Sequence, residues 1–191
     1  FKNINNSGLK AIKLKPEDDI IYVGLIEEID KEELLLATKL GQSIRFGSDN
    51  VRATGRDTMG VKAITLKEGD SVVSAMLIKD RDGMILTMTE NGYGKRTRID
   101  EYPLQARSGK GVINLRCNAK TGDVVSVLPA PDSEELMAIT SSGIVIRMPM
   151  SSITIYGRAT QGVIVMKVDN GEKVVSITKV KSEDDEIDEV S

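Results

Sequence analysis

The sequence predicts an all-β fold made of repeated units, on the strength of three observations. Residue types recur at a spacing of 51 along the chain, which indicates an array of similar supersecondary units. The apolar segments are four to eight residues long, rich in Val and Ile, and bounded by turn residues. No segment keeps a helical period over 11 residues. Because each unit holds about four such segments, we expect a propeller-like blade of four strands.

The first half of each unit predicts two strands joined by a glycine turn. The first strand of the pair is short and apolar, and it is expected at 34–37, 84–88 and 136–140. The second strand alternates apolar and polar residues, as at 43–46 and 144–148. Each pair therefore predicts a β-hairpin.

The second half of each unit predicts a loop and two further strands. The loop runs to an arginine and then a glycine, and a third apolar stretch follows at 61–66, 112–115 and 163–168. After a turn with a glycine and an acid, a β-branched strand closes the unit at 72–78, 124–128 and 174–180. The segment before residue 31 supplies only such a second half.

These units divide the chain into a partial blade at 1–30, three complete blades at about 31–80, 81–131 and 132–181, and an acidic tail at 182–191. Because residue 1 falls inside a repeat, the chain looks like an excised piece of something longer. From Glu183 to Ser191 the tail holds six acidic residues and no basic one, and we expect it to be disordered. Without the tail the sequence has 26 basic and 23 acidic residues (29 less 6). The rest of the chain is therefore slightly basic, although the net charge of the whole sequence is −3.

Two series of arginines recur in the repeat register: Arg45, Arg96 and Arg147, and Arg56, Arg107 and Arg158. In 144–148 the Ile and Met side chains share one face, so Arg147 takes the other and points to solvent. The same alternation gives Arg45 the same direction. In the middle unit Lys95 occupies the position of Ile44, so that strand either slips locally or carries Lys95 at an edge with its ammonium in solvent.

Rows of outward cations would suit a long anionic ligand, and phosphates rather than base edges would be the contacts. The middle unit concentrates such cations around only two acids: Lys95, Arg96, Arg98, Arg107 and Lys110. The alternative is structural, with the arginines pairing with acids of neighbouring units. Periodicity and charge leave both interpretations open.

Composition argues against catalysis by this chain. The sequence has no His, which removes the commonest general base and metal ligand and excludes a hydrolytic triad. Cys117 is the only cysteine, so no internal disulfide or thiolate zinc site is expected, and a reducing cytoplasm fits. The run 92–97 lacks the glycines of both common phosphate-loop patterns. No apolar run approaches the roughly 20 residues of a membrane span. We expect no catalytic site, cofactor, metal or membrane contact.

The middle unit resembles a known family. The runs 90–97 (ENGYGKRT) and 105–111 (QARSGKG) are similar to the C-terminal domain of the DNA gyrase A protein, and 140–147 and 157–163 look like further repeats of it. The resemblance implies a β-pinwheel, a propeller-like ring whose blades exchange strands, which wraps duplex DNA around a basic perimeter and so serves negative supercoiling by an ATP-dependent type II topoisomerase.

Carried onto this sequence, the resemblance implies that nine cations bind DNA: Arg45, Arg56, Lys95, Arg96, Arg98, Arg107, Lys110, Arg147 and Arg158. It also implies partnership with the rest of the gyrase A protein and with the gyrase B protein. The family's basic Gln-Arg-Arg-Gly-Gly box is absent from this sequence. The similar domain of topoisomerase IV lacks that box and is the close alternative. A propeller-like protein-interaction scaffold is the second.

Overall fold

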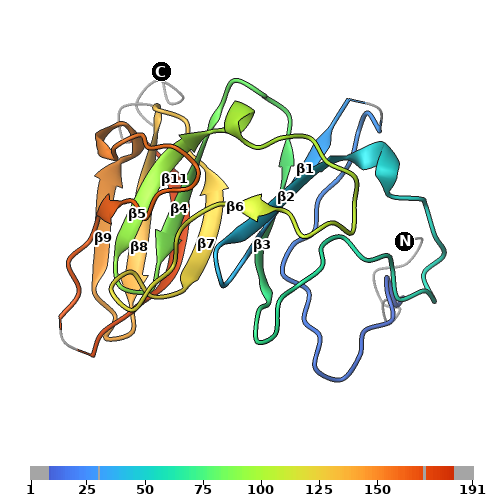
Figure 1. Ribbon diagram of the computed structural model, residues 1–191, viewed down its shortest axis with the longest axis horizontal. Helices are drawn as coiled ribbons and strands as arrows, with labels where there is room; N and C mark the ends of the chain where they lie inside the picture. The colour runs from blue at the N-terminus through green and yellow to red at the C-terminus, as the bar shows by residue number, and fades with distance from the viewer. Residues whose placement is uncertain (1–8, 30, 170, 183–191) are drawn as a thin grey trace, which may run out of the picture.

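The computed structural model describes residues 9–29, 31–169 and 171–182. Within them the chain forms eleven β-strands and three short 3-10 helices. Figure 1 shows the strands gathered into three successive sheets along the long axis of the molecule. The all-β, propeller-like prediction is confirmed. None of the helices in these residues is long and apolar enough to cross a bilayer.

The first sheet has the order β3-β1-β2-β6, and all its neighbours are antiparallel. Its strands are β1 (Glu33–Thr38), β2 (Gln42–Gly47), β3 (Val72–Ile78) and β6 (Val112–Ile113). The second sheet has the order β10-β5-β4-β7. Its strands are β4 (Met84–Thr89), β5 (Tyr93–Arg98), β7 (Val124–Pro129) and β10 (Val163–Ile164).

The third sheet has three strands, in the order β11-β8-β9. They are β8 (Glu134–Thr140), β9 (Val145–Pro149) and β11 (Val174–Lys181). A 3-10 helix follows the second strand of each hairpin: η1 (Ser48–Asn50), η2 (Ile99–Glu101) and η3 (Met150–Ser152).

Successive repeats exchange strands. The outer edge of β2 pairs with β6, which belongs to the next repeat, and the outer edge of β5 pairs with β10 in the same way. The segment 61–66, which occupies the corresponding place in the first repeat, forms no strand, and neither does 9–29. The strand expected at 61–66 is therefore absent, because no strand of the described chain lies beside it to complete a ladder.

The middle hairpin keeps a regular register. Thr87 pairs with Lys95 and Ile85 with Thr97, without a bulge between β4 and β5. The local slip that we considered for this strand is therefore wrong. Lys95 is buried instead, at 0% exposure.

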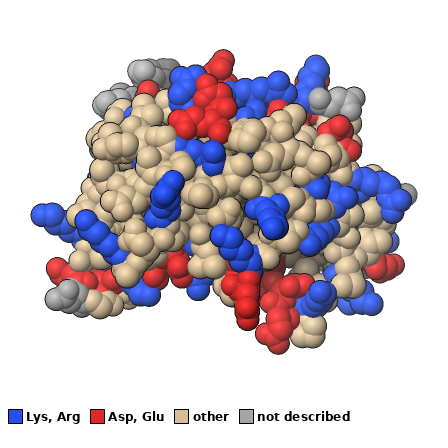
Figure 2. Space-filling model, viewed as in Figure 1, with Lys and Arg blue, Asp and Glu red and all other residues tan. Residues whose placement is uncertain are grey.

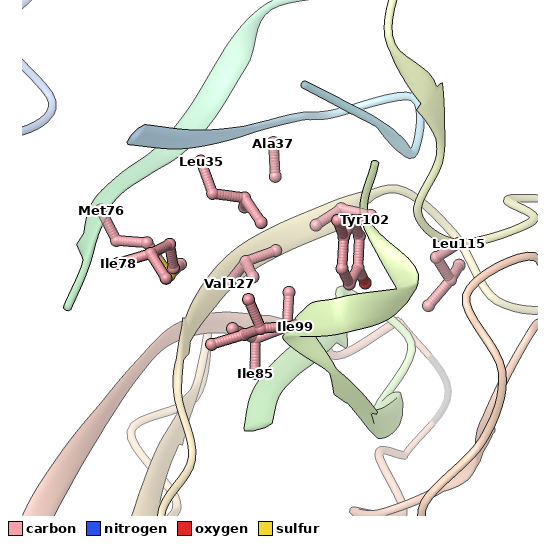
Figure 3. Close-up of a cluster of buried hydrophobic side chains, with 10 residues drawn as sticks. Leu35, Ala37, Met76, Ile78, Ile85, Ile99, Tyr102, Leu115 and Val127 are labelled. Carbon is pink, nitrogen blue, oxygen red and sulfur yellow. The ribbon is translucent and has the colours of Figure 1, made fainter. Parts of the chain in front are cut away.

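The hydrophobic core lies between successive sheets. Figure 3 shows Leu35 of β1 and Met76 of β3 facing Ile85 of β4 and Val127 of β7, with Tyr102 closing the cluster. An equivalent cluster, which includes Leu86, Met88 and Leu136, fills the space between the second and third sheets. Fully burying each such side chain stabilises the fold by about 1.5–3 kcal/mol, so the blades are held face to face mainly by these two clusters.

Two sequence expectations concern the ends of the chain. Residues 9–29 of the expected partial blade are described, whereas 1–8 and 30 lie outside the described residues. The expected acidic tail also lies outside them, apart from Ser182.

Candidate nucleic-acid interface

Arg45 lies on β2 and is buried, with 7% of its surface exposed. Its Nε donates to Glu33 Oε2 at 2.5 Å, and its Nη1 donates to the backbone carbonyls of Ile99 and Tyr102, both at 2.9 Å. Those carbonyls belong to the η2 turn of the next repeat. The prediction that Arg45 points to solvent is wrong, because the η2 turn covers the face of β2 that alternation left open.

Arg96 repeats this arrangement one repeat later, on β5. It is 4% exposed, and its Nε donates to Ile153 O at 2.9 Å while its Nη2 donates to Ser151 O at 3.3 Å, both in the η3 region. Its carboxylate partner is Asp132. Arg147, the third member of the series, binds Glu135 and donates to Lys181 O at 3.0 Å, and it lies at the surface.

Lys95 lies beside Arg96 with its side chain directed under the loop of the next repeat. Its Nζ donates to Gly157 O at 2.7 Å, to Arg158 O and to Thr160 Oγ1 at 3.3 Å. Burial lowers the pKa of Lys95 to about 8 and nearby Arg158 adds to this lowering, while Glu101 opposes it. The edge position that we considered for Lys95 is also wrong, because its ammonium finds backbone oxygens rather than water.

The second arginine series reaches back to the preceding repeat. Arg107 donates from Nη1 to Lys62 O and from Nε to Asn50 O at 3.2 Å. Arg158 donates in the same way to Ile113 O and, at 3.1 Å, to Glu101 O. In both cases the acceptors lie 45 and 57 residues earlier.

Four arginines therefore fasten one repeat to the next, and we call them the clamp arginines: Arg45, Arg96, Arg107 and Arg158. The structural alternative left open by the sequence describes them better than a free basic rim. Their main partners, however, are backbone carbonyls as well as acids.

The structure separates the nine expected cations by exposure. Arg45, Lys95 and Arg96 are buried, and Arg107 and Arg158 are half-buried. The exposed members are Arg56, Arg98, Lys110 and Arg147. Arg98 pairs with Asp100 at 2.9 Å, and Arg147 with Glu135. The three buried cations donate to backbone carbonyls and are at most 7% exposed, so they present little surface to a phosphate.

Arg52 and Lys62 are among the exposed cations that sequence reasoning did not select. Neither is marked by the repeat, because the residues 51 positions later are Pro103 and Ile113. Backbone hydrogen bonds from Ser108 N to Ala63 O (2.7 Å) and from Thr65 N to Gly109 O (2.8 Å) bring the segment that carries Lys62 beside the one that carries Lys110.

We call four exposed residues on the loops that follow η1 and η2 the loop cations: Arg52, Arg56, Lys62 and Lys110. Within the described residues, none of the four has an acidic partner. Figure 2 shows Lys and Arg side chains over most of this face, including a group at the end of the molecule that carries the N-terminal segment, and many acidic side chains along its upper and lower edges. This region has the chemistry to bind phosphates.

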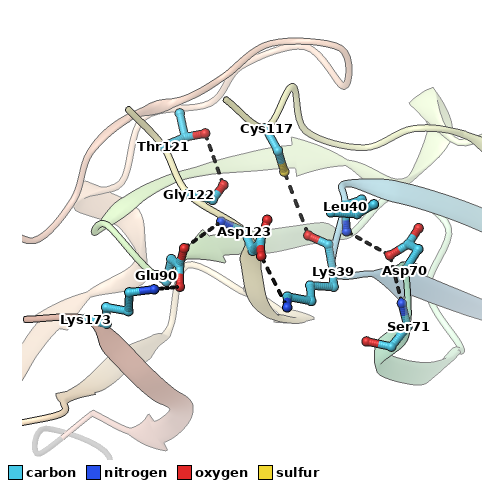
Figure 4. A network of polar contacts seen from close by, with 10 residues as sticks. All are labelled: Lys39, Leu40, Asp70, Ser71, Glu90, Cys117, Thr121, Gly122, Asp123 and Lys173. Atoms are coloured by element: carbon cyan, nitrogen blue, oxygen red, sulfur yellow. Dashed lines mark hydrogen bonds and ion pairs between the residues drawn. The ribbon is translucent and has the colours of Figure 1, made fainter. Parts of the chain in front are cut away.

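At the turns of the hairpins, in contrast, charges are paired between repeats. Figure 4 shows Lys39 paired with Asp123 and Lys173 paired with Glu90. The Nζ of Lys39 lies 3.4 Å from Asp123 Oδ2, and the Nζ of Lys173 lies 2.6 Å from Glu90 Oε2. The hydrogen bond from Lys173 lowers the pKa of Glu90. Burial raises the pKa of nearby Cys117 to about 11, so its thiol is not activated. This region offers few free cations to an anion.

The chain matches a family model described as "DNA gyrase C-terminal domain, beta-propeller" over residues 1–27, 32–79, 83–131 and 134–181. It is 42% identical to the DNA gyrase A protein of Deinococcus deserti, over 97% of this chain and 23% of that protein. It is 41% identical to the DNA gyrase A protein of Escherichia coli, over 98% of this chain and 21% of that protein. The chain thus spans about a fifth of the length of these relatives.

Two solved structures share the fold. The C-terminal domain of a DNA topoisomerase IV superposes with a TM-score of 0.84 and 29% identity, over 91% of this chain and 53% of that one. The DNA gyrase A C-terminal domain superposes with a TM-score of 0.79 and 27% identity, over 90% and 58%. Because the family model covers four consecutive ranges that together make up most of the chain, the protein belongs to the DNA gyrase C-terminal domain family.

Proposed function

We propose that this chain is a non-catalytic module that binds duplex DNA through its phosphates and helps to wrap it, in the service of negative supercoiling by gyrase. The observation that carries the proposal is the match of four consecutive ranges to the gyrase C-terminal domain. In this role the chain acts in the cytoplasm, together with the rest of the gyrase A protein and with the gyrase B protein. The hydrolytic and strand-passing chemistry resides in those other parts.

We assign contact with DNA to the four loop cations. Arg56 and Lys110 remain from the expected set, and Arg52 and Lys62 join them, because all four are exposed and carry no acidic partner among the described residues. Arg107 has a supporting role. Its guanidinium holds the carbonyl of Lys62, so it fixes the loop that presents the Lys62 ammonium.

Binding through phosphates makes a quantitative prediction. Each neutralised phosphate contributes about −0.9 to the slope of log K against log salt on duplex DNA, so four loop cations predict a slope of about −3.6. A protein-interaction scaffold, the competing function, predicts weak binding to DNA that hardly responds to changes at these positions. The topoisomerase IV alternative predicts the same local contacts, and the relatives above favour gyrase.

The test compares two double variants of equal net charge. Arg56→Glu with Lys110→Glu removes two loop cations, whereas Lys31→Glu with Lys179→Glu removes two exposed lysines that pair with Glu28 and Glu134. Affinity for a long duplex of mixed sequence is measured by fluorescence anisotropy over a salt series.

We expect the first double variant to bind at least about tenfold more weakly and with a slope shallower by about 2, since each phosphate contact adds about 1. The second should stay close to the unaltered chain. Equal losses in both variants would show a non-specific charge effect and would contradict the assignment to the loop cations.

A further inference from the structure

The end strands β6 and β10 of the first and second sheets each carry one exposed isoleucine. Ile113 of β6 is 37% exposed, and Ile164 of β10 is 52% exposed. The two residues lie 51 positions apart, in the register of the repeat, and we call them the edge isoleucines. A single exposed apolar residue needs no special explanation, whereas the same residue exposed at the same place in two repeats calls for one.

The backbone around Ile113 directs its side chain outward. Ile113 pairs with Gln42 of β2. The residues on either side of it are turned inward, because Asn114 is fully buried and Val112 packs against the first core cluster. Since successive side chains of a strand point to opposite faces, the side chain of Ile113 points away from the core.

Ile164 has the same surroundings one repeat later. It pairs with Tyr93 of β5, and Val165 after it packs against the second core cluster. Val165 N also donates to Gly92 O at 2.9 Å. The two edge isoleucines therefore stand at equivalent places on the surface, on backbone that is held in position.

The clamp arginines relate Ile113 to one of the loop cations. Arg107 donates from Nη1 to the carbonyl of Lys62, and Arg158 donates from Nη1 to the carbonyl of Ile113. Lys62 and Ile113 are also 51 residues apart, and both are exposed. The same kind of clamp thus presents a lysine at the first junction and an isoleucine at the second.

Ile113 also follows a loop cation along the chain. Lys110 precedes it by three residues, so their Cα atoms are at most about 11 Å apart. The minor groove of duplex DNA is about 6 Å wide. A duplex that Lys110 holds by a phosphate therefore brings its sugars and the wall of its minor groove within reach of Ile113.

We propose that the edge isoleucines make apolar contacts with the deoxyribose rings along the minor groove, beside the phosphate contacts of the loop cations. This inference rests on the proposed function, since it takes duplex DNA as the ligand. DNA is the occupant because Ile113 stands in the place of Lys62, is presented by an equivalent clamp and adjoins Lys110. Leucine and isoleucine are side chains that minor-groove binding proteins place against the duplex.

Apolar and phosphate contacts differ in their response to salt. A phosphate contact releases counterions, so it weakens as salt rises. An apolar contact releases none, and it strengthens binding by a similar factor at every salt concentration. The loop cations therefore set the salt slope, whereas the edge isoleucines add affinity without changing that slope.

The first test replaces both edge isoleucines with threonine, which keeps the β-branched shape and removes apolar surface. The matched control is Leu66→Thr with Val175→Thr, since these side chains are 40% and 53% exposed and lie on neither β6 nor β10. Affinity for a long duplex of mixed sequence is measured by fluorescence anisotropy over a salt series, and urea midpoints show that each variant is folded.

We expect Ile113→Thr with Ile164→Thr to bind about five- to tenfold more weakly at every salt concentration, with an unchanged slope, because apolar surface is lost from the contact. The control should bind like the unaltered chain.

The second test adds a charge in place of an apolar side chain. Ile164→Lys is compared with Val175→Lys, because the two positions are 52% and 53% exposed and gain the same charge. Val175 lies on β11, at the opposite edge of its sheet from β9. Ile164→Lys should form one more phosphate contact and steepen the slope by about 1, whereas Val175→Lys should leave the slope unchanged.

The outcomes separate this inference from the proposed function. Binding that falls in Arg56→Glu with Lys110→Glu but not in the threonine variant would overturn the apolar contact alone and leave the edge isoleucines to a protein partner. A shallower slope in the threonine variant would also overturn it, because the isoleucines would then act by positioning the cations. An unaltered chain that does not bind the duplex would overturn both.

Discussion

The junction between the first and second repeats and the junction between the second and third are fastened by the same devices but filled differently. Both have an exchanged strand, a forward and a backward clamp arginine, and an ion pair at the hairpin turns. Under the loop of the next repeat, however, the first junction places Ile44 and the second places Lys95, both at 0% exposure. The same backbone arrangement therefore accommodates either an apolar or a charged side chain at this buried position.

The clamp arginines of the two junctions also differ, in how deeply their carboxylate partners are buried. The carboxylate partner of Arg45 is Glu33, which is 3% exposed and also binds Arg81 at 2.7 Å. The partner of Arg96 is Asp132, whose side chain is 76% exposed, because Met84 occupies the position of Glu33 in the middle repeat. The first junction buries its ion pair, whereas the second keeps one partner in water.

The largest effect on stability is expected from substitution of the clamp arginines at the two junctions. Arg45→Ala leaves the buried Glu33 carboxylate with less compensation, and we expect it to lower the free energy of unfolding by about 3–5 kcal/mol. Arg96→Ala leaves an exposed carboxylate and two carbonyls without a donor, and we expect a loss of about 1–3 kcal/mol. Urea unfolding followed by circular dichroism measures both.

The matched variant for this prediction is Glu33→Gln, which keeps the size of the partner and removes its charge. It should bring the effects of the two arginine substitutions closer together. If Arg96→Ala proved as costly as Arg45→Ala in the unaltered background, the burial of Glu33 would not be what distinguishes the junctions.

The next largest effect is expected from substitution of Lys95, the side chain buried at the second junction. Lys95→Met removes the donor from Gly157 O and Arg158 O, and we expect a loss of about 1–2 kcal/mol at pH 7. Ile44→Met, the matched change at the first junction, should cost less than about 1.5 kcal/mol. The two variants differ most clearly in how their stability depends on pH.

The sign of that dependence follows from the pKa of Lys95, which burial lowers from its ordinary value of 10.5 to about 8. Between these two values the unfolded chain keeps the proton that the folded chain has lost, so stability rises with pH. The penalty for burying the charged ammonium is complete below pH 8 and is relieved toward pH 10.5. The stability difference between the unaltered chain and Lys95→Met should therefore change steadily in favour of the unaltered chain over this window, and a flat difference would contradict the assignment.

Much of the fold could be predicted from the sequence because β-strands leave local signals. The closing strand expected at 72–78 is β3, and the strand expected at 84–88 is β4 with one further residue. The stretch at 61–66 fails as a strand for a non-local reason, since a ladder needs a neighbour and local sequence does not report one.

The site was harder to predict because alternation assigns a face but not its environment. Alternation separates Arg45 from Ile44 correctly, yet both faces of β2 are buried, one in a third apolar cluster of Ile44, Phe46 and Ile64 and the other by the η2 turn. The acceptors of the clamp arginines are backbone carbonyls, and a carbonyl has no signature in the sequence. Lys62 was missed because it stands outside the repeat register.

The smallest effect is expected at the hairpin turns, where the ion pairs of the two junctions have opposite polarity. Lys39→Glu places two like charges together at the exposed pair with Asp123, and it should lower the free energy of unfolding by less than about 1 kcal/mol. The double variant Lys39→Glu with Asp123→Lys should recover this loss.

Lys173→Glu should shift the urea midpoint further, because its partner Glu90 also accepts from Asp123 N at 3.3 Å and has a lowered pKa. A lowered carboxylate pKa gives stability that is present above the ordinary value of 4.5 and is lost as pH falls. The effect of Lys173→Glu should therefore shrink in acid and in high salt, whereas an effect that salt leaves unchanged would point to packing rather than to charge.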